Sequence, residues 1–300
     1  MFGFLFRVLK FSHKTQFAQK LLQKAYTTCD MSTYNKKGLA LGEVINSLNS
    51  YANITYAASW DNVGLLIEPT EPKNISHILL TNDLTEKVMQ EAIDIQTDMI
   101  ISYHPPIFKA LRTVTTNTWK ERIVAKCLEN KIALYSPHTS FDSIQGGVND
   151  WLTSAFDIKE SYPIEPGEDP RIGMGRYCTL KNKITVDEAV NLIKYHTRLD
   201  YVRLARAVNS DGYVSKVGLC AGAGTSVLQG LSADLYVTGE MLHHDILDAV
   251  HKGTSVILTN HSDSERGFLK HVFAKKLSDA LKNAVAISVS VQDEDPLKTV

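Results

Sequence analysis

The stretch Ser255–Phe268, SVILTNHSDSERGF, is the part of the chain around which the rest is organised. An apolar, β-branched run gives way to a polar turn, a pattern that predicts a buried strand followed by a loop. His261 stands in that loop four residues before Glu265, and Ser264 or Asp263 is placed to cap a following helix. An imidazole and a carboxylate at a strand's end suit a metal ion. The same residues also fit a plain capping turn, in which Glu265 complements the helix dipole and His261 lies at the surface.

Size and composition predict a globular chain with one large domain or two domains of ordinary size. Of the 300 residues, 44% are hydrophobic and 22% are charged. A disordered chain would have fewer apolar residues and a larger net charge. The four cysteines are scattered and form no CxxC pair, which argues against a thiolate zinc site and against a disulfide framework. They favour a reducing compartment.

The first 29 residues contain five basic side chains and no acidic one, interleaved with phenylalanine, leucine and valine. This composition is typical of a mitochondrial transit segment, which we place at residues 1–30. Its apolar stretch is too short and too interrupted by cations to span a bilayer, so no membrane association is expected. Met31 offers a second start, and a shorter form with a cytoplasmic or nuclear location is the alternative.

The remainder of the chain is net acidic. Residues 30–300 hold 27 basic and 33 acidic side chains, a net charge of −6. Such a body has no general electrostatic attraction to the phosphate backbone, so direct binding of nucleic acid is not expected.

Strands and helices alternate from residue 39 onward. The expected strands lie at 77–81, 98–103, 132–135, 177–180, 201–205, 216–220, 235–237, 256–258 and 285–291, and the main helices at 39–52, 86–95, 119–130, 186–195 and 241–252. This alternation is typical of α/β lobes with mostly parallel or mixed sheets. A loop at residues 162–170, rich in Pro, Glu and Gly, is the best boundary. It divides the chain into lobes at 33–159 and 160–300, which leaves room for the two to interleave.

The polar residues that could carry chemistry follow the expected strands. His104 follows one strand, His138 and Asp142 follow the next, and Glu240 and His261 follow strands in the second half. In open α/β sheets, ligands bind outside the carboxyl ends of the strands. The repeated placement therefore favours one shared site over separate structural roles.

Each of these side chains has its own expected part. Two prolines follow His104 and hold its backbone extended, which fixes the imidazole. Asp142 can bridge two ions or make an Asx turn. His138 is better placed to orient a ligand through its ring nitrogen than to bind a metal directly. Glu240 offers a carboxylate with two histidines at helical spacings after it.

Other constellations are weaker. The AGAGT stretch at residues 221–225 lacks the full dinucleotide fingerprint and the P-loop lysine, so its expected role is a tight turn between a strand and a helix. The sequence contains no GxSxG elbow, and no cysteine stands beside a histidine as a nucleophile would require.

Five motifs occur in order between residue 60 and residue 268. They are WDNVGL (60–65), SYHPPIF (102–108), SPHTSFD (136–142), TGE with the histidines after it (238–244) and NHSDSERGF (260–268). Together they resemble the NIF-three-like proteins, also classed as GTP cyclohydrolase I type 2 homologues, and the animal branch above all. The similarity runs from about residue 39 to the C-terminus.

The resemblance implies two linked α/β lobes, a dinuclear metal site in the cleft between them, and often a toroidal hexamer built from dimers. The ligands that it implies are His104, Asp142, His261 and Glu265. The chain departs from the bacterial pattern at Tyr103, where those members carry a second histidine. Four ligands then remain for two ions, so a second ion is weakly held, absent, or completed by Glu240, His138 or Tyr103.

The leading interpretation is a metal-dependent, hydrolase-like protein that acts on a nucleotide or a related small phosphorylated or purine substrate. Two ions roughly 3.5 to 4 Å apart would lower the pKa of a shared water and polarise the substrate. His138 or Glu240 is the candidate proton shuttle. Imidazole and carboxylate ligands without thiolate admit one or two ions of zinc, manganese, iron, cobalt or nickel.

The alternative is a regulatory or scaffold protein of the transcriptional co-regulator type, with a structural metal site and with protein partners. A filled coordination shell would favour that role, and an open position on the ion would favour an enzyme. In either case a homo-oligomer between dimer and hexamer is expected.

Overall fold

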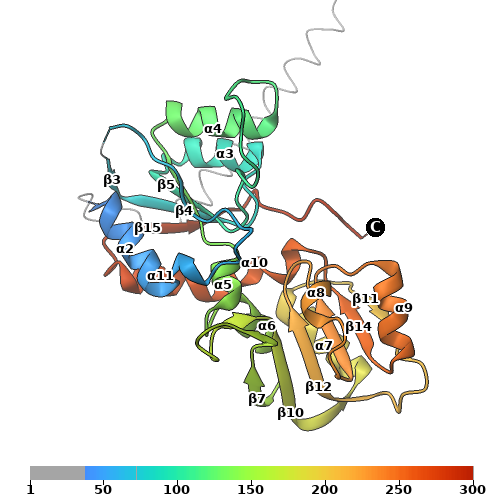
Figure 1. Ribbon diagram of the computed structural model, residues 1–300. Helices are drawn as coiled ribbons and strands as arrows, with labels where there is room; N and C mark the ends of the chain where they lie inside the picture. Colours follow the sequence, from blue (N-terminus) through green and yellow to red (C-terminus); the bar gives the residue numbers. More distant parts are fainter. Residues whose placement is uncertain (1–37, 72, 300) are drawn as a thin grey trace, which may run out of the picture. The chain divides into compact units, whose positions relative to one another are not determined.

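The computed structural model describes residues 38–71 and 73–299 (Figure 1). The expected transit segment at residues 1–30 and the alternative start at Met31 lie outside the described residues. Among the helices that are described, none combines the length and the apolar character needed to cross a bilayer.

One sheet has five strands in the order β15-β4-β5-β6-β2. Neighbouring strands are parallel, except that β2 runs antiparallel to β6 at one edge. The strands are β2 (Gly64–Ile67), β4 (His77–Thr81), β5 (Met99–Ser102), β6 (Ala133–Ser136) and β15 (Ala286–Val289).

A second sheet has six strands in the order β11-β14-β13-β12-β10-β7. Its three central strands, β12 to β14, are parallel, and the strands on either side of them run antiparallel to their neighbours. The strands are β7 (Ile158–Tyr162), β10 (Arg176–Thr185), β11 (Arg203–Ala205), β12 (Tyr213–Cys220), β13 (Leu235–Thr238) and β14 (Ser255–Leu258). Two short pairs, β1 (Leu39–Ala40) with β3 (Asn74–Ile75) and β8 (Glu165–Pro166) with β9 (Gly173–Met174), complete the strands. The predicted α/β class with mixed sheets is confirmed.

The helices lie between the strands, as the alternation predicted. They are α2 (Leu41–Tyr51), α3 (Glu86–Asp94), α4 (Trp119–Glu129), α5 (Thr139–Ser143), α6 (Val148–Thr153), α7 (Val186–Thr197), α8 (Thr225–Leu228), α9 (His243–His251), α10 (Arg266–Phe268) and α11 (Ala274–Ala280). Short 3₁₀ turns lie at η2 (Ile54–Tyr56) and η3 (Ser262–Ser264), and a π-helical turn, η4 (Leu269–Phe273), joins α10 to α11. Thr85 caps α3, because its side chain accepts a hydrogen bond from the backbone N–H of Val88.

The cap expected at Ser264 or Asp263 is wrong. Residues 262–264 form a 3₁₀ turn, α10 begins only after Glu265, and no side chain caps it. The Ser264 hydroxyl instead donates to the carbonyl of His261 and accepts from the backbone N–H of Gly222. These two hydrogen bonds hold the polar turn against the loop at residues 221–225, and the Ser264 side chain does not cap the helix.

Helices cover both faces of the five-stranded sheet. Helices α3 and α4 pack on one face through a core that contains Leu79, Ile100 and Leu134, while α2 and α11 lie on the other face (Figure 1). Successive residues of a strand point to opposite faces of the sheet. Because helices bury both faces, a strand of this sheet requires a nearly continuous run of apolar residues.

A single apolar core continues from this sheet to the six-stranded sheet. Phe141 of α5, Trp151 of α6 and Phe268 of α10 belong to the same buried cluster as strand residues of both sheets. Rings of Phe141 and Phe268 meet edge to face, with their centroids 5.8 Å apart. The ends of the two sheets that carry these short helices are thereby fixed to each other.

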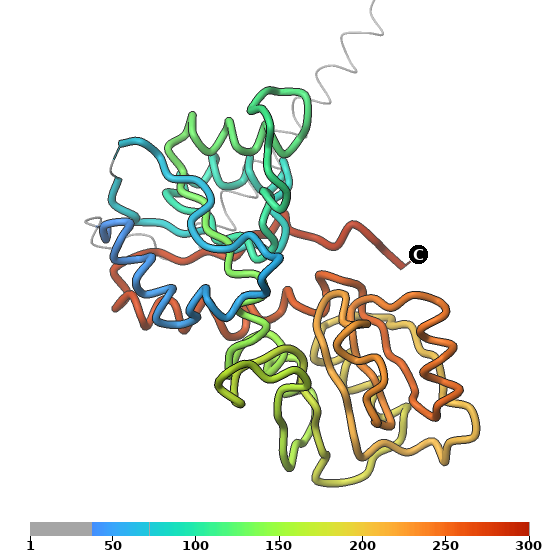
Figure 2. Tube along the Cα trace, in the orientation of Figure 1, coloured from blue at the N-terminus to red at the C-terminus, as the bar shows by residue number. Residues whose placement is uncertain are grey.

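The chain returns to the first sheet at its end. From β14 it passes through α10, η4 and α11 to β15, which pairs with β4 over Ala286–Val289 (Figure 2). The division expected at residues 159 and 160 falls inside β7 and assigns β15 to the second half of the chain. By strand pairing, β15 belongs with the strands of the first half, so the two halves interleave.

Gly267 of α10 gives a test of this packing, with Gly42 of α2 as its matched control. A Cβ on Gly267 would lie 2.2 Å from a ring atom of Trp151, whereas a Cβ on Gly42 would meet nothing within 4 Å. We expect Gly267→Ala to lower the free energy of unfolding by about 1–3 kcal/mol through overpacking. Gly42→Ala should raise it by about 0.5–1 kcal/mol, because alanine favours the helix. Urea denaturation of both variants measures the difference, and equal effects would contradict the packing of α10 on α6.

Candidate metal centre

Three side chains from distant parts of the chain bring their donor atoms together. His104 Nε2 lies 3.2 Å from Glu265 Oε2, and His261 Nε2 lies 3.7 Å from Glu265 Oε1. One donor atom from each residue can be chosen so that all three lie within 4.8 Å of one another. The two imidazole rings have their centroids 5.1 Å apart. The structure thus brings His104 from the first half of the chain together with His261 and Glu265 from the second half, as the sequence predicted.

The strand ends explain this convergence. His104 stands two residues beyond β5, and His261 stands three residues beyond β14. Asp142, in α5 after β6, and Glu240, after β13, arrive at carboxyl ends in the same way. Strands of both sheets therefore point their carboxyl ends toward one group of polar side chains.

A carboxylate holds the second nitrogen of each imidazole. His104 Nδ1 lies 2.9 Å from Asp83 Oδ1, and His261 Nδ1 lies 3.1 Å from Glu240 Oε2. When each carboxylate accepts the Nδ1 proton, the Nε2 lone pair is left free to bind a cation, and this is the arrangement that metal-binding histidines usually have. His104 Nε2 is buried and makes no hydrogen bond, although Glu265 lies beside it. A nitrogen that binds a metal ion has no hydrogen-bond donor among the protein's own groups, so this unpaired nitrogen fits a metal ligand.

The charges at the site attract a cation. Glu265 is 3% exposed; burial alone would raise its pKa, but the positive charge of a protonated His104 lowers it below its ordinary value. Burial alone would lower the pKa of His104, and the carboxylates of Glu265 and Asp83 instead raise it well above its usual range. A divalent ion could take the place of that proton between the same acidic groups.

Asp142 lies beside this group and is held by Tyr103. Both residues are buried, and the Tyr103 hydroxyl donates to Asp142 Oδ1 over 2.5 Å. Burial and the neighbouring carboxylate of Glu265 raise the pKa of Asp142 to about 6. The other carboxylate oxygen of Asp142, Oδ2, does not accept this hydrogen bond. The role of Asp142 as a ligand stays a prediction, since the three-donor group forms without it.

A third imidazole, that of His138, borders the donors. Its ring centroid lies 5.3 Å from that of His104, and its Nδ1 lies 2.8 Å from Asp61 Oδ1. Asp61 also accepts hydrogen bonds from the backbone N–H and the hydroxyl of Thr139. The backbone of His138 has φ 35° and ψ −120°, outside the regions that non-glycine residues favour, so the surrounding hydrogen bonds hold it against local strain. Its function as a proton shuttle or orienting group stays a prediction.

The sequence interpretation missed two residues of the turn after β4. Asn82 Nδ2 donates to Glu265 Oε2 over 3.0 Å, and Asp83 holds His104 as described above. The turn is fixed in its own right, because Asp293 near the C-terminus accepts the backbone N–H of Asn82. Both residues follow a predicted strand at its carboxyl end, as the recognised residues do, but that position alone does not show which partners they contact.

Gly222 in the AGAGT loop is shaped to this site. Its φ is +64°, and a Cβ there would lie 2.6 Å from Glu265 Oε1 and 3.2 Å from His261 Nε2. Glycine thus leaves space beside the donor atoms that any other residue would fill. The loop makes the expected turn after β12, and it also forms one wall of the donor group.

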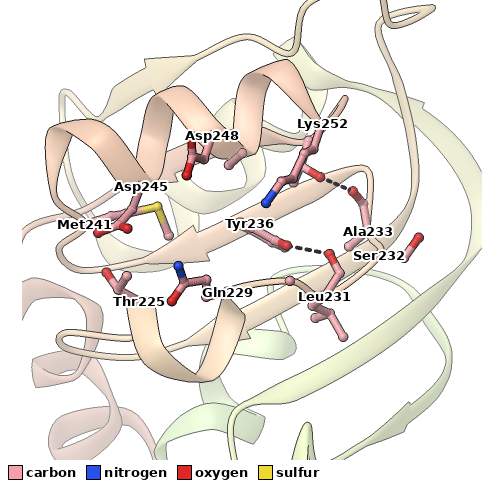
Figure 3. Close-up of a pocket in the computed structure, with 13 residues that line it drawn as sticks. Thr225, Gln229, Leu231, Ser232, Ala233, Tyr236, Met241, Asp245, Asp248 and Lys252 are labelled. Carbon is pink, nitrogen blue, oxygen red and sulfur yellow. Dashed lines mark hydrogen bonds between the residues drawn. The ribbon is translucent and has the colours of Figure 1, made fainter.

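A separate cavity of about 250 Å³ lies between α8 and α9. Its wall includes Tyr236, Lys252, Gln229 and the carboxylates of Asp245 and Asp248 (Figure 3). Its described lining contains no histidine and none of the expected ligands. The donor chemistry therefore places the candidate metal centre at His104, His261 and Glu265, rather than in this cavity.

The family model described as Duf34/NIF3 (NGG1p interacting factor 3) matches residues 39–296. The chain belongs to this family. It is 48% identical to NIF3-like protein 1 of Drosophila melanogaster, over 90% of this chain and 92% of that protein. It is 36% identical to the human NIF3-like protein 1, over 87% of this chain and 92% of that protein. The resemblance drawn from the five motifs is confirmed.

Solved structures of other proteins share the fold. A Bacillus cereus protein related to NIF3 aligns with a TM-score of 0.79 at 21% identity, covering 88% of this chain and 100% of that one. Reduced HcgD from Methanocaldococcus jannaschii aligns with a TM-score of 0.72 at 24% identity, covering 84% and 97%. At these identities the likeness shows the arrangement of strands and helices.

Asp83 gives a test of the carboxylate–histidine arrangement. We expect Asp83→Asn to weaken divalent-metal binding by about 10- to 100-fold, because the amide no longer fixes the Nδ1 proton of His104. Asp94→Asn is the matched control, since Asp94 is exposed on α3 and pairs only locally with Gln90. Competition with a chromophoric chelator measures both affinities. Unchanged affinity in Asp83→Asn would contradict the role of Asp83 in orienting His104 for a metal ion.

Proposed function

We propose that the chain binds one or two divalent ions through His104, His261 and Glu265, with Asp142 as a further ligand. We further propose that it hydrolyses a nucleotide or a related small phosphorylated or purine substrate. The observation that supports this most is the buried Nε2 of His104, which lacks a hydrogen-bond donor and faces the Glu265 carboxylate. When bound, the ions would supply Lewis acidity to the substrate and to water.

The chain's own residues would prepare this chemistry. Asp83 and Glu240 hold the two imidazoles with their Nε2 lone pairs toward Glu265. Asn82 donates to Glu265 Oε2 and so fixes the orientation of that carboxylate. These contacts keep the donor atoms in place before any ion arrives, which reduces the cost of ordering them.

Two groups are suited to moving protons. The Glu240 side chain is 52% exposed and contacts His261, so it can exchange protons between the site and solvent. The His138 side chain is 15% exposed and lies against the ring of His104. We propose Glu240 or His138 as the proton shuttle, because each is close to the donors and outside the three-donor group.

The three-donor group accounts for one ion, and a second ion needs further ligands. Asp142 could supply one oxygen, but Tyr103 already donates to the other. We therefore propose one firmly held ion and a second that binds more weakly, completed by Asp142 with His138 or Glu240. Zinc, manganese, iron, cobalt and nickel all suit imidazole and carboxylate ligands.

A regulatory role is the second proposal, and a relative's name supports it. The Saccharomyces cerevisiae protein called NGG1-interacting factor 3 is 37% identical over 86% of this chain, and its name gives a protein partner for that protein. In this proposal the chain binds a regulatory protein, and the ion holds His104, His261 and Glu265 together as a structural site.

We propose a homo-oligomer of two to six copies, with the donor group in a cleft between a lobe built on the five-stranded sheet and a lobe built on the six-stranded sheet. We propose a mitochondrial location directed by residues 1–30, with a cytoplasmic or nuclear form when translation begins at Met31.

Elemental analysis of protein purified without chelator tests the metal site. We expect at least one divalent ion per chain, and less than a tenth of that in the double variant His261→Ala with Glu265→Gln. The double variant His251→Ala with Glu129→Gln is the matched control, because both residues are exposed and outside the site. Full metal content in the first double variant would refute the assignment of these ligands.

The same samples separate the two proposed functions. Phosphate or ring-opened product should form from a panel of nucleotides with the wild type and the control, and should be lost with the metal. If the wild type retains its metal and turns over none of the panel, while metal loss abolishes partner binding, the regulatory proposal is favoured. Metal loss that leaves assembly and partner binding intact would count against it.

A further inference from the structure

Two exposed aromatic side chains, Trp60 and Phe108, stand beside the metal donors, and we call them the aromatic platform. Trp60 is 63% exposed and Phe108 is 41% exposed. Their ring centroids lie 6.0 Å apart at an interplanar angle of 66°. Both meet the ring of His138, at 6.1 Å and 6.3 Å, and that ring lies 5.3 Å from His104. A continuous series of rings thus leads from the surface to the donor group.

The platform is held rigidly. Asn62 Nδ2 donates to the carbonyl of Ile107 over 2.5 Å, which ties the turn that carries Trp60 to the loop that carries Phe108. The backbone N–H of Ala58 donates to the Thr139 hydroxyl, which fixes the other end of the turn on α5. The large exposed area of Trp60 therefore belongs to an anchored turn and does not result from a loose loop.

Asp61 links the platform directly to the site. Its side chain is fully buried, and it binds His138 Nδ1 together with two donors of Thr139. Since Asp61 follows Trp60 in the chain, the same residue that places the indole also orients the imidazole next to His104. A buried carboxylate and several hydrogen bonds therefore fix the turn that keeps the Trp60 indole ring exposed beside the donors.

The geometry of the platform selects a flat ligand. Because Trp60 and Phe108 meet edge to face, a planar ring can stack on one while its edge contacts the other, and aromatic rings prefer both arrangements. An indole face binds nitrogen heterocycles without regard to their hydrogen-bond pattern. Two side chains are also too few to form a stable protein interface, which covers about 800 Å² on each partner.

We infer that Trp60 and Phe108 bind the planar ring of a nitrogen heterocycle whose other end reaches the metal donors. This inference rests on the proposed function, because the donors define the part of the ligand that reacts. It assigns the recognition of the ring to residues outside the donor group. The platform therefore determines which class of substrate is held, while His104, His261 and Glu265 hold the ion.

Binding of paired probes tests the inference. The probes are GMP, CMP and nicotinamide mononucleotide, each compared with ribose 5-phosphate, which carries the sugar phosphate without a ring. In calorimetric titrations of the metal-loaded full chain, at least one nucleotide should bind roughly 10-fold or more tightly than ribose 5-phosphate. Trp60→Leu should weaken that binding by roughly 5- to 100-fold, the range found for the loss of one stacking partner.

Matched variants show whether the effect belongs to the platform. Trp60→Phe should retain most of the affinity, because it keeps an aromatic face. Trp119→Leu should change nothing, since Trp119 is a 43% exposed tryptophan on α4 outside the platform. Phe108→Leu should reduce the preference for the nucleotide over ribose 5-phosphate. Equal effects of Trp60→Leu and Trp119→Leu would overturn the inference.

Metal content measured on the same samples separates the inference from the proposed function. If metal is bound and all three nucleotides bind no more tightly than ribose 5-phosphate, the ring inference is wrong and the metal site stands. If the chain holds no metal but still shows a Trp60-dependent preference for a nucleotide, the proposed function is wrong and the platform stands. A changed oligomer mass in Trp60→Leu with unchanged nucleotide affinity would identify the platform as an interface and overturn the inference.

Discussion

The structure depends on the buried carboxylate of Glu265. At 3% exposure it has lost nearly all contact with water, and an ionised carboxylate in such a place must be paired or bound to a cation. It is met by His104 from one sheet, by His261 from the other, and by the side-chain amide of Asn82. Because these partners come from both halves of the chain, satisfying Glu265 requires the two sheets to hold one arrangement, which the shared core around Phe141 maintains.

The carboxyl ends of parallel strands make this arrangement possible. Strands β4, β5 and β6 end on one side of the five-stranded sheet, and β12, β13 and β14 end on one side of the other. Short polar turns follow each of them, so acidic residues and histidines can gather without interrupting the apolar strands. Gly222, with its left-handed backbone, lets the turn after β12 approach the donors closely. The apolar runs stabilise the fold, and the turns carry the candidate metal donors.

Much of this could be predicted from the sequence, for reasons that are local. The strand β4 was predicted with the bounds that it has, and the positions of His104 and His261 followed from the strands before them. The pairing of β15 with β4 could not be predicted, since an apolar strand does not say which neighbour it takes. The hydrogen bonds of Asp61 with His138 and of Asp83 with His104 likewise join turns that are far apart in the sequence. A short polar turn looks the same in sequence whether it holds a ligand or only ends a strand.

The contact between Tyr103 and Asp142 bears on the charge of the site. Asp142 and Glu265 are both buried and repel each other, which contributes to raising the pKa of Asp142 to about 6. Tyr103 is neutral, because burial and the nearby acidic groups raise its pKa well above its usual value. It therefore satisfies one oxygen of Asp142 by a hydrogen bond without adding a positive charge. A histidine at this position could bind a cation through its lone pair, whereas the protonated Tyr103 hydroxyl donates to Asp142 and brings no anionic oxygen to a cation. Tyr103 thus supplies the contact that keeps Asp142 in place. The negative charge of Asp142 and Glu265 is left for His104 and His261, or for the ion that we propose binds there, to balance.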